Sequence, residues 1–321
     1  MRVLSGIQPS GKLHLGNYFG MMKPALELQD KQAETFLFIA NYHALTSVQE
    51  PSAMRSGTED VAMDFLACGL DPRKTVFYRQ SDVPKVHELA WLLSIVTPMG
   101  LLERCHSYKD KTARGITPTH GLFAYPVLMA ADILAVQSDI VPVGQDQKQH
   151  VEVTRDLAIK FNNRFGETFK VPEPLIKDDV AVVPGIDGQK MSKSYNNSIE
   201  LFLPQNELRK ACMRIVTDSK SVADKKDPDK CNVFALYRLF AQKEKCALMA
   251  ARYREGGIGY GDVKKELAEL IWQYFSAARL KREQLQANPG EVERILREGA
   301  EKARQVIDIT LKKSRTAVGL E

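Results

Sequence analysis

Short apolar segments alternate with amphipathic segments along the first half of the chain. The apolar runs Val3–Ile7, Thr35–Ala40 and Thr75–Tyr78 are bounded by turn residues, which is typical of buried strands. From Pro51, and again from Val86 to Leu93, apolar residues recur at helical spacing. Strands that alternate with helices predict an α/β fold with a Rossmann-type parallel sheet.

The alternation is interrupted near residues 101–120, where charge, glycine and proline predict an insertion or loop. Beyond it, the apolar run Tyr125–Leu134 contains a single carboxylate. A further strand is expected at Asp139–Gly144 and a helix from Asp146 to Phe165. Pro24 lies inside the first expected helix, so it must either kink that helix or end its first segment.

From about Pro204 the pattern becomes almost wholly helical. The spacing of apolar residues predicts one helix around 208–215, a second from Val233 to Ala250 and a third from Val263 to Leu285. Such a change of pattern indicates that a C-terminal all-helical domain follows the sheet domain.

We therefore expect a catalytic-type sheet domain at 1–197, a helical domain at 198–287 and a separate C-terminal helix at 288–321. Asn288 and Pro289 suit the N-cap and first position of this last helix. Its apolar stripe must be covered, and we expect it to pack back on the sheet domain.

Composition limits the class of protein. The chain has 321 residues, of which 26% are charged and 44% hydrophobic, as in globular proteins that stay in solution. Its net charge of +5 permits a nucleic-acid or polyphosphate partner. We find no signal-peptide core and no apolar stretch of about 18 residues, so a cytoplasmic protein without a membrane partner is expected.

The cysteines are odd in number, widely spaced and without a Cys-x-x-Cys pair. Zinc is therefore not expected, and no metal site on protein side chains is predicted. Free thiols in a reducing compartment are expected instead. They are Cys68, Cys105, Cys212, Cys231 and Cys246.

The loop Lys190–Ser194 carries two lysines and two serines and follows the turn-forming run Pro184–Gly188. Two ammonium groups three residues apart can neutralise the charge that develops on a leaving polyphosphate. A solvated surface loop would have the same composition, so the interpretation depends on the rest of the chain.

A second candidate phosphate site is Pro9–Asn17, between the first strand and the first helix, where open α/β sheets bind nucleotides. Gly11 and Gly16 let a ligand approach the backbone. His14 can donate to phosphate oxygens or pack beside a base, although a histidine after a turn can also be purely structural.

Two segments in this order resemble the signatures of class I aminoacyl-tRNA synthetases. His14–Asn17 resembles their His-Ile-Gly-His sequence, and Lys190–Ser194 matches their Lys-Met-Ser-Lys-Ser loop unaltered. The resemblance narrows to the tryptophanyl-tRNA synthetases of bacterial type through Gly6–Gly11, Tyr125–Leu134 and Val141–His150. It is denser in the sheet domain than in the helical region.

This resemblance implies a tryptophan–tRNA ligase. Such an enzyme joins L-tryptophan to the α-phosphate of ATP, releases pyrophosphate, and passes tryptophan to the 3′ end of its cognate tRNA. Neither step needs a protein nucleophile, so catalysis should rest on positioning and charge stabilisation. The resemblance also implies ATP with Mg²⁺ and a homodimer. Some relatives hold an iron–sulfur cluster on clustered cysteines, a pattern that this chain lacks, so none is expected.

The resemblance assigns catalytic roles to Lys190 and Lys193, which would clamp pyrophosphate with Mg²⁺, and to His14. Lys109 and Lys111 in the insertion are further candidate cations, or else part of a solvated loop. Asp146 would accept the ribose hydroxyls, cap the following helix, or do both. The expected ATP-binding residues are Gln8, Pro9, Ser10, Gly16, Asn17, Gly144, Gln145, Asp146, Lys190, Met191, Ser192, Lys193 and Ser194.

Asp132 is the candidate specificity residue. A carboxylate in an apolar run needs a donor, and the indole nitrogen is a donor only. Met129, one turn earlier, would pack on the indole ring or belong to the core. Because phenol also donates, pocket size must reject tyrosine. The resemblance adds Tyr125 and Gln147 for the ammonium group, and His43, Val141 and Val143 as walls; His43 could instead be structural.

A basic surface of the helical domain is the candidate site for the tRNA anticodon, mainly because of the resemblance. A solvated basic face is the simpler interpretation. A tyrosine-activating enzyme and a noncatalytic RNA-binding paralogue are the competing functions. The basic residues are Arg209, Lys210, Arg214, Lys220, Lys225, Lys226 and Lys230.

Overall fold

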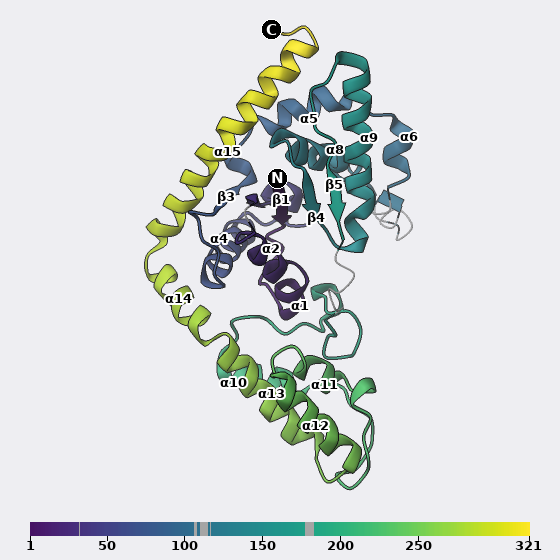
Figure 1. Ribbon diagram of the computed structural model, residues 1–321, viewed down its shortest axis with the longest axis vertical. Helices are drawn as coiled ribbons and strands as arrows, with labels where there is room; N and C mark the ends of the chain where they lie inside the picture. Colours follow the sequence, from purple (N-terminus) through teal and green to yellow (C-terminus); the bar gives the residue numbers. More distant parts are fainter. Residues whose placement is uncertain (32, 106–107, 110–114, 116, 177–182) are drawn as a thin grey trace.

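A five-stranded parallel sheet forms the centre of the larger part of the molecule (Figure 1). The strand order is β3-β2-β1-β4-β5. The computed structural model describes residues 1–321 except 32, 106–107, 110–114, 116 and 177–182. The strands are β1 (Arg2–Ile7), β2 (Glu34–Ile39), β3 (Thr75–Arg79), β4 (Ile140–Pro142) and β5 (Glu173–Leu175).

This order confirms the predicted Rossmann-type sheet. β1 pairs with β2 on one side and with β4 on the other. The strand order therefore reverses between β1 and β4, and the carboxyl ends of these two strands lie next to each other. Open α/β sheets bind ligands there. Sequence reasoning missed β5, because three residues that include Pro174 carry no strand pattern.

The first helical segment is divided just before Pro24. It consists of α1 (Leu15–Asn17), the π-helical turn η1 (Tyr18–Met22) and α2 (Lys23–Leu28). The N–H of Lys23 donates to the carbonyl of Tyr18, five residues back, and Pro24 occupies the first turn of α2. A proline in the first turn loses no helical hydrogen bond, so the segment continues.

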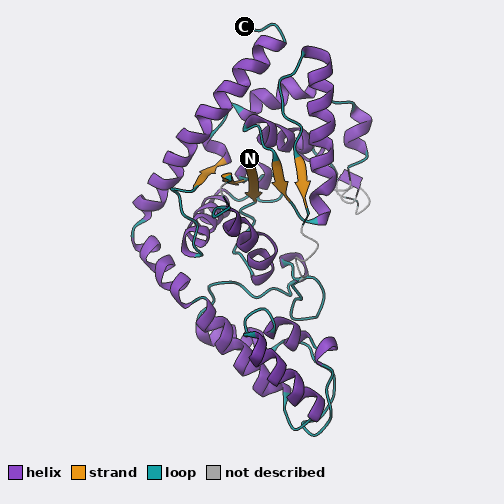
Figure 2. Ribbon diagram, in the orientation of Figure 1, coloured by secondary structure: helices purple, strands orange, loops and turns teal. Residues whose placement is uncertain are grey.

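The longer helices of this part surround the sheet (Figure 2). Pro126 lies inside α8, the helix that carries Asp132. The helices are α3 (Asn41–Ala44), α4 (Pro51–Ala67), η2 (Gln80–Asp82), α5 (Val86–Ser94), α6 (Met99–Glu103), α8 (His120–Ala135), η3 (Gln145–Gln147), α9 (Lys148–Phe165) and η4 (Lys193–Tyr195).

A smaller helical region lies at one end of the long axis, apart from the sheet (Figure 1). The predictions of single helices at 233–250 and 263–285 were wrong, because each range contains two helices. Gln242 is extended and interrupts the first, while Phe275 leaves helical geometry and packs into a cluster of aromatic rings. The helices are α10 (Gln205–Met213), η5 (Pro228–Lys230), α11 (Asn232–Tyr237), α12 (Lys243–Glu255) and α13 (Tyr260–Tyr274).

Helices α14 (Ser276–Ala287) and α15 (Pro289–Ala317) run back from the helical region along one side of the molecule (Figure 1). Gly299 lets α15 approach β3 closely, since an added Cβ there would lie 1.8 Å from the Phe77 carbonyl oxygen. The apolar stripe of α15 continues through the buried Ala303 and Ile307. No helix in the described parts of the chain combines the length and apolarity needed to cross a bilayer.

Candidate active site

The two phosphate-type segments of the sequence are in direct contact. The N–H of Gly16 lies 3.3 Å from the sulfur of Met191, which is buried. A Cβ added to Gly16 would lie 3.3 Å from the Cβ of Met191 and 2.9 Å from Nδ1 of His14. Only a residue without a side chain fits between His14 and the lysine loop without displacing one of them.

Backbone pairing fixes the same two segments relative to each other. The N–H of Leu15 donates to Ile199 O at 2.9 Å, and the N–H of Leu201 donates to Leu13 O at 3.0 Å. His14 and Glu200 form the antiparallel bridge between these bonds. The lysine loop is therefore connected at its carboxyl end to the turn that follows β1.

Asn197 organises the lysine loop from inside and is 1% exposed. Its Oδ1 accepts the N–H of Ser192 at 2.7 Å, and its Nδ2 donates to Asp187 Oδ1 at 2.8 Å and Lys190 O at 3.1 Å. A Cβ on Gly185 would lie 2.3 Å from Nδ2. Sequence reasoning did not select Asn197, because an asparagine in a polar loop gives no sign of burial.

Lys193 reaches across to the turn after β1. Its Nζ donates to the carbonyl of Ser10 at 3.2 Å. Burial lowers the pKa of Lys193, and the carboxylates of Glu200 and Asp64 act in the opposite direction. Lys190 is exposed on the same loop. The loop thus places one ammonium group beside the Pro9–Ser10 backbone and one at the surface.

The turn after β1 also lies against α4. Gly57 is inside that helix, and a Cβ added to it would lie 2.7 Å from the carbonyl oxygen of Pro9. A glycine inside a helix costs roughly 0.5–1 kcal/mol relative to alanine. The close approach of Pro9 gives a physical reason for the glycine, and the local sequence pattern does not indicate it.

His14 is the N-cap of α1 and is held by a reciprocal capping box. Its Nδ1 accepts the N–H of Asn17 at 3.2 Å, and Asn17 Oδ1 accepts the N–H of His14 at 3.1 Å. Burial, with a smaller contribution from the charge of Lys193, lowers the pKa of His14 to about 4. The imidazole is therefore neutral near pH 7 and carries its proton on Nε2, as a donor.

The remaining candidate nucleotide residues lie at the carboxyl ends of β1 and β4. Gln8 and Ser10 follow β1, and Gly144 and Gln145 follow β4; all four are exposed. Ser194 is exposed and Ser192 is half-buried at the start of η4. Their hydroxyl oxygens lie 2.8 Å apart. Lys111 and the side chain of Asp146 lie outside what the structure describes.

Asp132 is the most enclosed carboxylate of the candidate tryptophan site and is 4% exposed. Its Oδ2 accepts from His43 Nε2 at 2.8 Å. Gln80 Nε2 donates to Oδ1 at 3.0 Å and to Oδ2 at 2.8 Å. His43 therefore contacts the candidate specificity residue directly. Gln80 was not predicted, since nothing in the sequence links the end of β3 to residue 132.

The other candidate tryptophan residues surround the same region. Tyr125 hydroxyl and His150 Nε2 are 2.6 Å apart, and the rings of Tyr125 and His43 are 6.2 Å apart at nearly right angles. Val141 is buried in the core, and Met129 and Val143 are half-buried against it. Gln147 is half-buried at the end of η3.

A cavity of about 460 Å³ lies beside these residues, between α3, α5 and α8. His43 and Tyr125 form part of its wall, and the exposed side chains of Leu45 and Trp91 form another part. The cavity thus joins the candidate tryptophan site to an apolar surface.

The described residues do not form a metal site. Nowhere among them do three His, Cys, Asp or Glu side chains gather as ligands for a metal ion. The five cysteines are free thiols.

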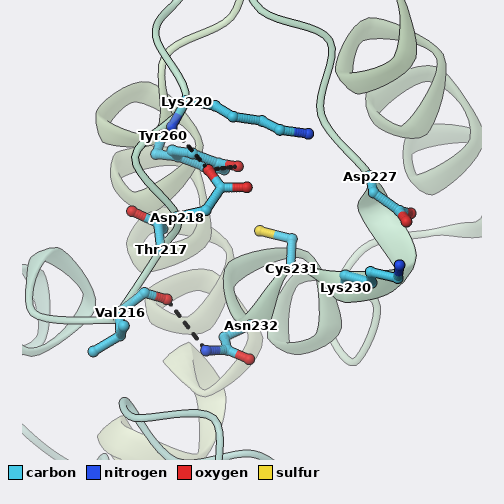
Figure 3. Close-up of a pocket in the computed structure, with 9 residues that line it drawn as sticks. All are labelled: Val216, Thr217, Asp218, Lys220, Asp227, Lys230, Cys231, Asn232 and Tyr260. Atoms are coloured by element: carbon cyan, nitrogen blue, oxygen red, sulfur yellow. Dashed lines mark hydrogen bonds between the residues drawn. The ribbon is translucent and has the colours of Figure 1, made fainter.

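A second cavity, of about 370 Å³, lies in the helical region (Figure 3). Asp218 Oδ1 accepts from the Tyr260 hydroxyl at 2.7 Å and from the N–H of Lys220 at 3.1 Å. The Tyr260 hydrogen bond is the main cause that lowers the pKa of Asp218. The other carboxylate oxygen faces the middle of the cavity (Figure 3), and Lys230 lies on its wall.

The assignment of Lys226 to the basic surface was wrong. Lys226 is only 3% exposed, and its Nζ donates to the carbonyls of Ser221 at 2.6 Å and Asp224 at 3.0 Å. Its ammonium group therefore organises the loop beside the cavity. The other six basic residues of the predicted surface are exposed: Arg209, Lys210, Arg214, Lys220, Lys225 and Lys230.

The sequence model of the class I tRNA synthetases (W and Y) matches residues 1–276. Together with the sheet and the two paired segments, this match defines the class: the chain belongs to the class I tRNA synthetase family of the W and Y type. Within that family, relatives of high identity are named tryptophan–tRNA ligases.

The tryptophan–tRNA ligase of Rhodopirellula baltica is 54% identical over 320 residues and covers 100% of both chains. That of Fusobacterium nucleatum is 52% identical and covers 99% of this chain and 98% of its own. The crystal structure of tryptophanyl-tRNA synthetase from Campylobacter jejuni complexed with ADP and tryptophan superposes with a TM-score of 0.95, at 50% identity over 100% of each chain.

Proposed function

We propose that this chain is a tryptophan–tRNA ligase, which activates L-tryptophan with ATP and transfers it to the 3′ end of its cognate tRNA. The observation that carries the proposal is the contact between Gly16 and Met191, with Lys193 bonded to Ser10 beside it. It joins the two signature segments into one site at the end of β1, in a chain whose full-length relatives are tryptophan–tRNA ligases.

Activation needs no nucleophile from the protein. The tryptophan carboxylate attacks the α-phosphate, the bond to the β-phosphate breaks, and pyrophosphate leaves with the negative charge. Lys193 and Lys190 would stabilise that charge, and neutral His14 would donate a hydrogen bond from Nε2. Because Lys193 is already held over the Ser10 carbonyl, little reorganisation is required. Mg²⁺ bound to the phosphate oxygens of ATP would offset further negative charge.

Recognition of tryptophan is assigned to Asp132 and its surroundings. The carboxylate is buried and accepts only, so it suits the indole N–H. Tyr125 and Gln147 would bind the ammonium end, and Met129, Val141 and Val143 would contact the ring. A residue that pairs with a specific substrate N–H rejects substrates without it, because the acceptor would then be buried and unpaired.

The helical region is assigned to the tRNA anticodon. Its cavity combines the Asp218 carboxylate, an acceptor for base amino groups, with Lys220 and Lys230 for phosphates. Sequence-specific RNA recognition uses unpaired bases that can enter such a pocket. The cavity is large enough for one base, and the loop that forms it is fixed by Lys226.

We further propose a cytoplasmic homodimer, as the sequence resemblance implies. The exposed side chains of Trp91 (71%) and Leu45 (57%), which border the same cavity, support the dimer, because large apolar groups rarely gather on the surface of a monomer. A second copy of the chain would cover them.

The test is amino-acid-dependent exchange of pyrophosphate into ATP, measured with tryptophan and tyrosine in parallel. Exchange should depend on tryptophan and be at least roughly 10⁴-fold weaker with tyrosine, since pocket shape and hydrogen bonding discriminate together. Charging of a tryptophan tRNA transcript should follow. Exchange that tyrosine supports better, or that neither amino acid supports, would refute the proposal.

A further inference from the structure

Gln80 is a fully buried amide that the proposed reaction does not yet use. It follows β3, in η2, and its exposed fraction is 0%. Its Oε1 lies 3.1 Å from the N–H of Tyr42 and 3.4 Å from the N–H of His43, and accepts from both. Its Nε2 donates to both oxygens of Asp132. Gln80 thus links α3 to the last turn of α8.

The surroundings leave only one orientation for this amide. If the amide were turned over, its NH₂ group would face the two backbone N–H donors and its oxygen would face the carboxylate. All the contacts would then be repulsive, because an amide oxygen cannot donate and the N–H groups cannot accept. The NH₂ group of Gln80 is therefore directed at Asp132 by the backbone of Tyr42 and His43.

The hydrogen bonds divide unequally between the two oxygens of Asp132. Among the described residues, Oδ2 accepts from Gln80 at 2.8 Å and from His43 at 2.8 Å, whereas Oδ1 accepts one longer bond, from Gln80 at 3.0 Å. A carboxylate oxygen has two lone pairs. Oδ2 is therefore saturated within these contacts, while Oδ1 keeps one position for a further donor.

We propose that Gln80 is a positioning residue for substrate choice: it fixes the rotation of the Asp132 carboxylate so that Oδ1 accepts the indole N–H of the substrate. The inference rests on the proposed function, in which Asp132 recognises tryptophan. A neutral amide can fix the rotation of the carboxylate without adding a positive charge that would compete with the indole N–H. His43 contributes to the same orientation through its hydrogen bond to Oδ2.

The test uses two substrates that differ only in the donor. L-Tryptophan and its benzothiophene analogue, in which sulfur replaces the indole N–H, are compared by kcat/KM in pyrophosphate exchange. The wild-type enzyme should strongly prefer tryptophan. Gln80→Met keeps the side-chain length but removes the bonds to Asp132, and should reduce that preference roughly ten- to hundredfold, as expected for a hydrogen bond to a charged group. The KM for ATP should stay unchanged.

Ser81→Ala is the matched control. It removes the 2.8 Å bond from Asn41 Nδ2 in the same turn without touching Asp132, so any general loosening of this loop appears there too. It should leave the preference for tryptophan over the analogue unchanged. A merely structural role of Gln80 would slow both substrates equally.

Gln80→Glu provides a second variant if Gln80→Met does not fold. It retains the acceptor for the N–H groups of Tyr42 and His43 but places an oxygen against Asp132, and should lower the same preference at pH 8. An unchanged preference in the folded variant overturns the inference while the proposed function stands. A wild-type enzyme that is inactive with tryptophan overturns both.

Discussion

At the scale of single residues, the candidate site depends on groups whose chemistry is set by burial. His14 is an example, since its ring nitrogen caps α1 and the surroundings lower its pKa to about 4. The role of the residue then differs from that of a phosphate-binding cation. It stays neutral at physiological pH, and the positive charge beside it belongs to Lys193.

This pKa predicts how stability depends on pH. Between pH 6.5 and about 4 the unfolded chain binds a proton at residue 14 that the folded chain does not. The free energy of unfolding should therefore fall as the pH is lowered from 7 to 5, and His14→Gln should remove part of that fall. Urea unfolding at both pH values measures it. The exposed His87→Gln is the control, and an equal fall in wild type and His14→Gln would contradict the assigned pKa.

Some residues of the site could be predicted from local sequence signals, whereas others depend on contacts between residues that are distant in sequence. Asp132 and Lys193 stand out because their types are unusual in their segments or match a known signature. Gln80, Gly57 and Asn197 act through partners that are distant in sequence, such as the Pro9 carbonyl near Gly57. No local pattern reports such a contact, so only the fold reveals it.

At the scale of elements, the sequence predicted most where an element is long and apolar. β1, β2 and β3 fall where expected, and the α/β class with a helical C-terminal region is confirmed. The breaks at Gln242 and Phe275 were missed, because tertiary packing ends those helices while their apolar spacing continues.

A prediction at the scale of elements concerns the segment 216–232, which lines most of the cavity in the helical region and is proposed to contact tRNA. In Asp218→Asn, the amide oxygen keeps accepting from the Tyr260 hydroxyl and the N–H of Lys220, so an NH₂ donor replaces the carboxylate oxygen that faces the cavity, and the negative charge is lost. The KM for tRNA in the charging assay should rise roughly tenfold, within the range for one base contact, while pyrophosphate exchange stays unchanged. Asp262→Asn, an exposed position on α13, is the control. If exchange fell as much as charging, the cavity would have no specific role in RNA binding.

At the scale of the whole molecule, segment 186–201, which contains the lysine loop, lies between the sheet and the helical region and is bonded to both. Toward the sheet, Leu15 and Ile199 pair; toward the helical region, the N–H of Val216 donates to Ile186 O at 2.6 Å. On the other side, Arg282 of α14 contacts Asp64 of α4 at 2.6 Å, and burial raises the pKa of that carboxyl to about 6. The relative placement of the two parts thus fixes the loop over the site.

The central claim is that this loop and the turn after β1 form one site for the phosphates of ATP. The most direct test is Lys193→Met, with the exposed Lys302→Met on α15 as control. The single-turnover rate of tryptophanyl-adenylate formation should fall roughly 10²-fold or more, as for loss of one preorganised charge contact, while the dissociation constant for tryptophan stays the same. A variant that bound tryptophan more weakly but formed adenylate at the wild-type rate would contradict the account.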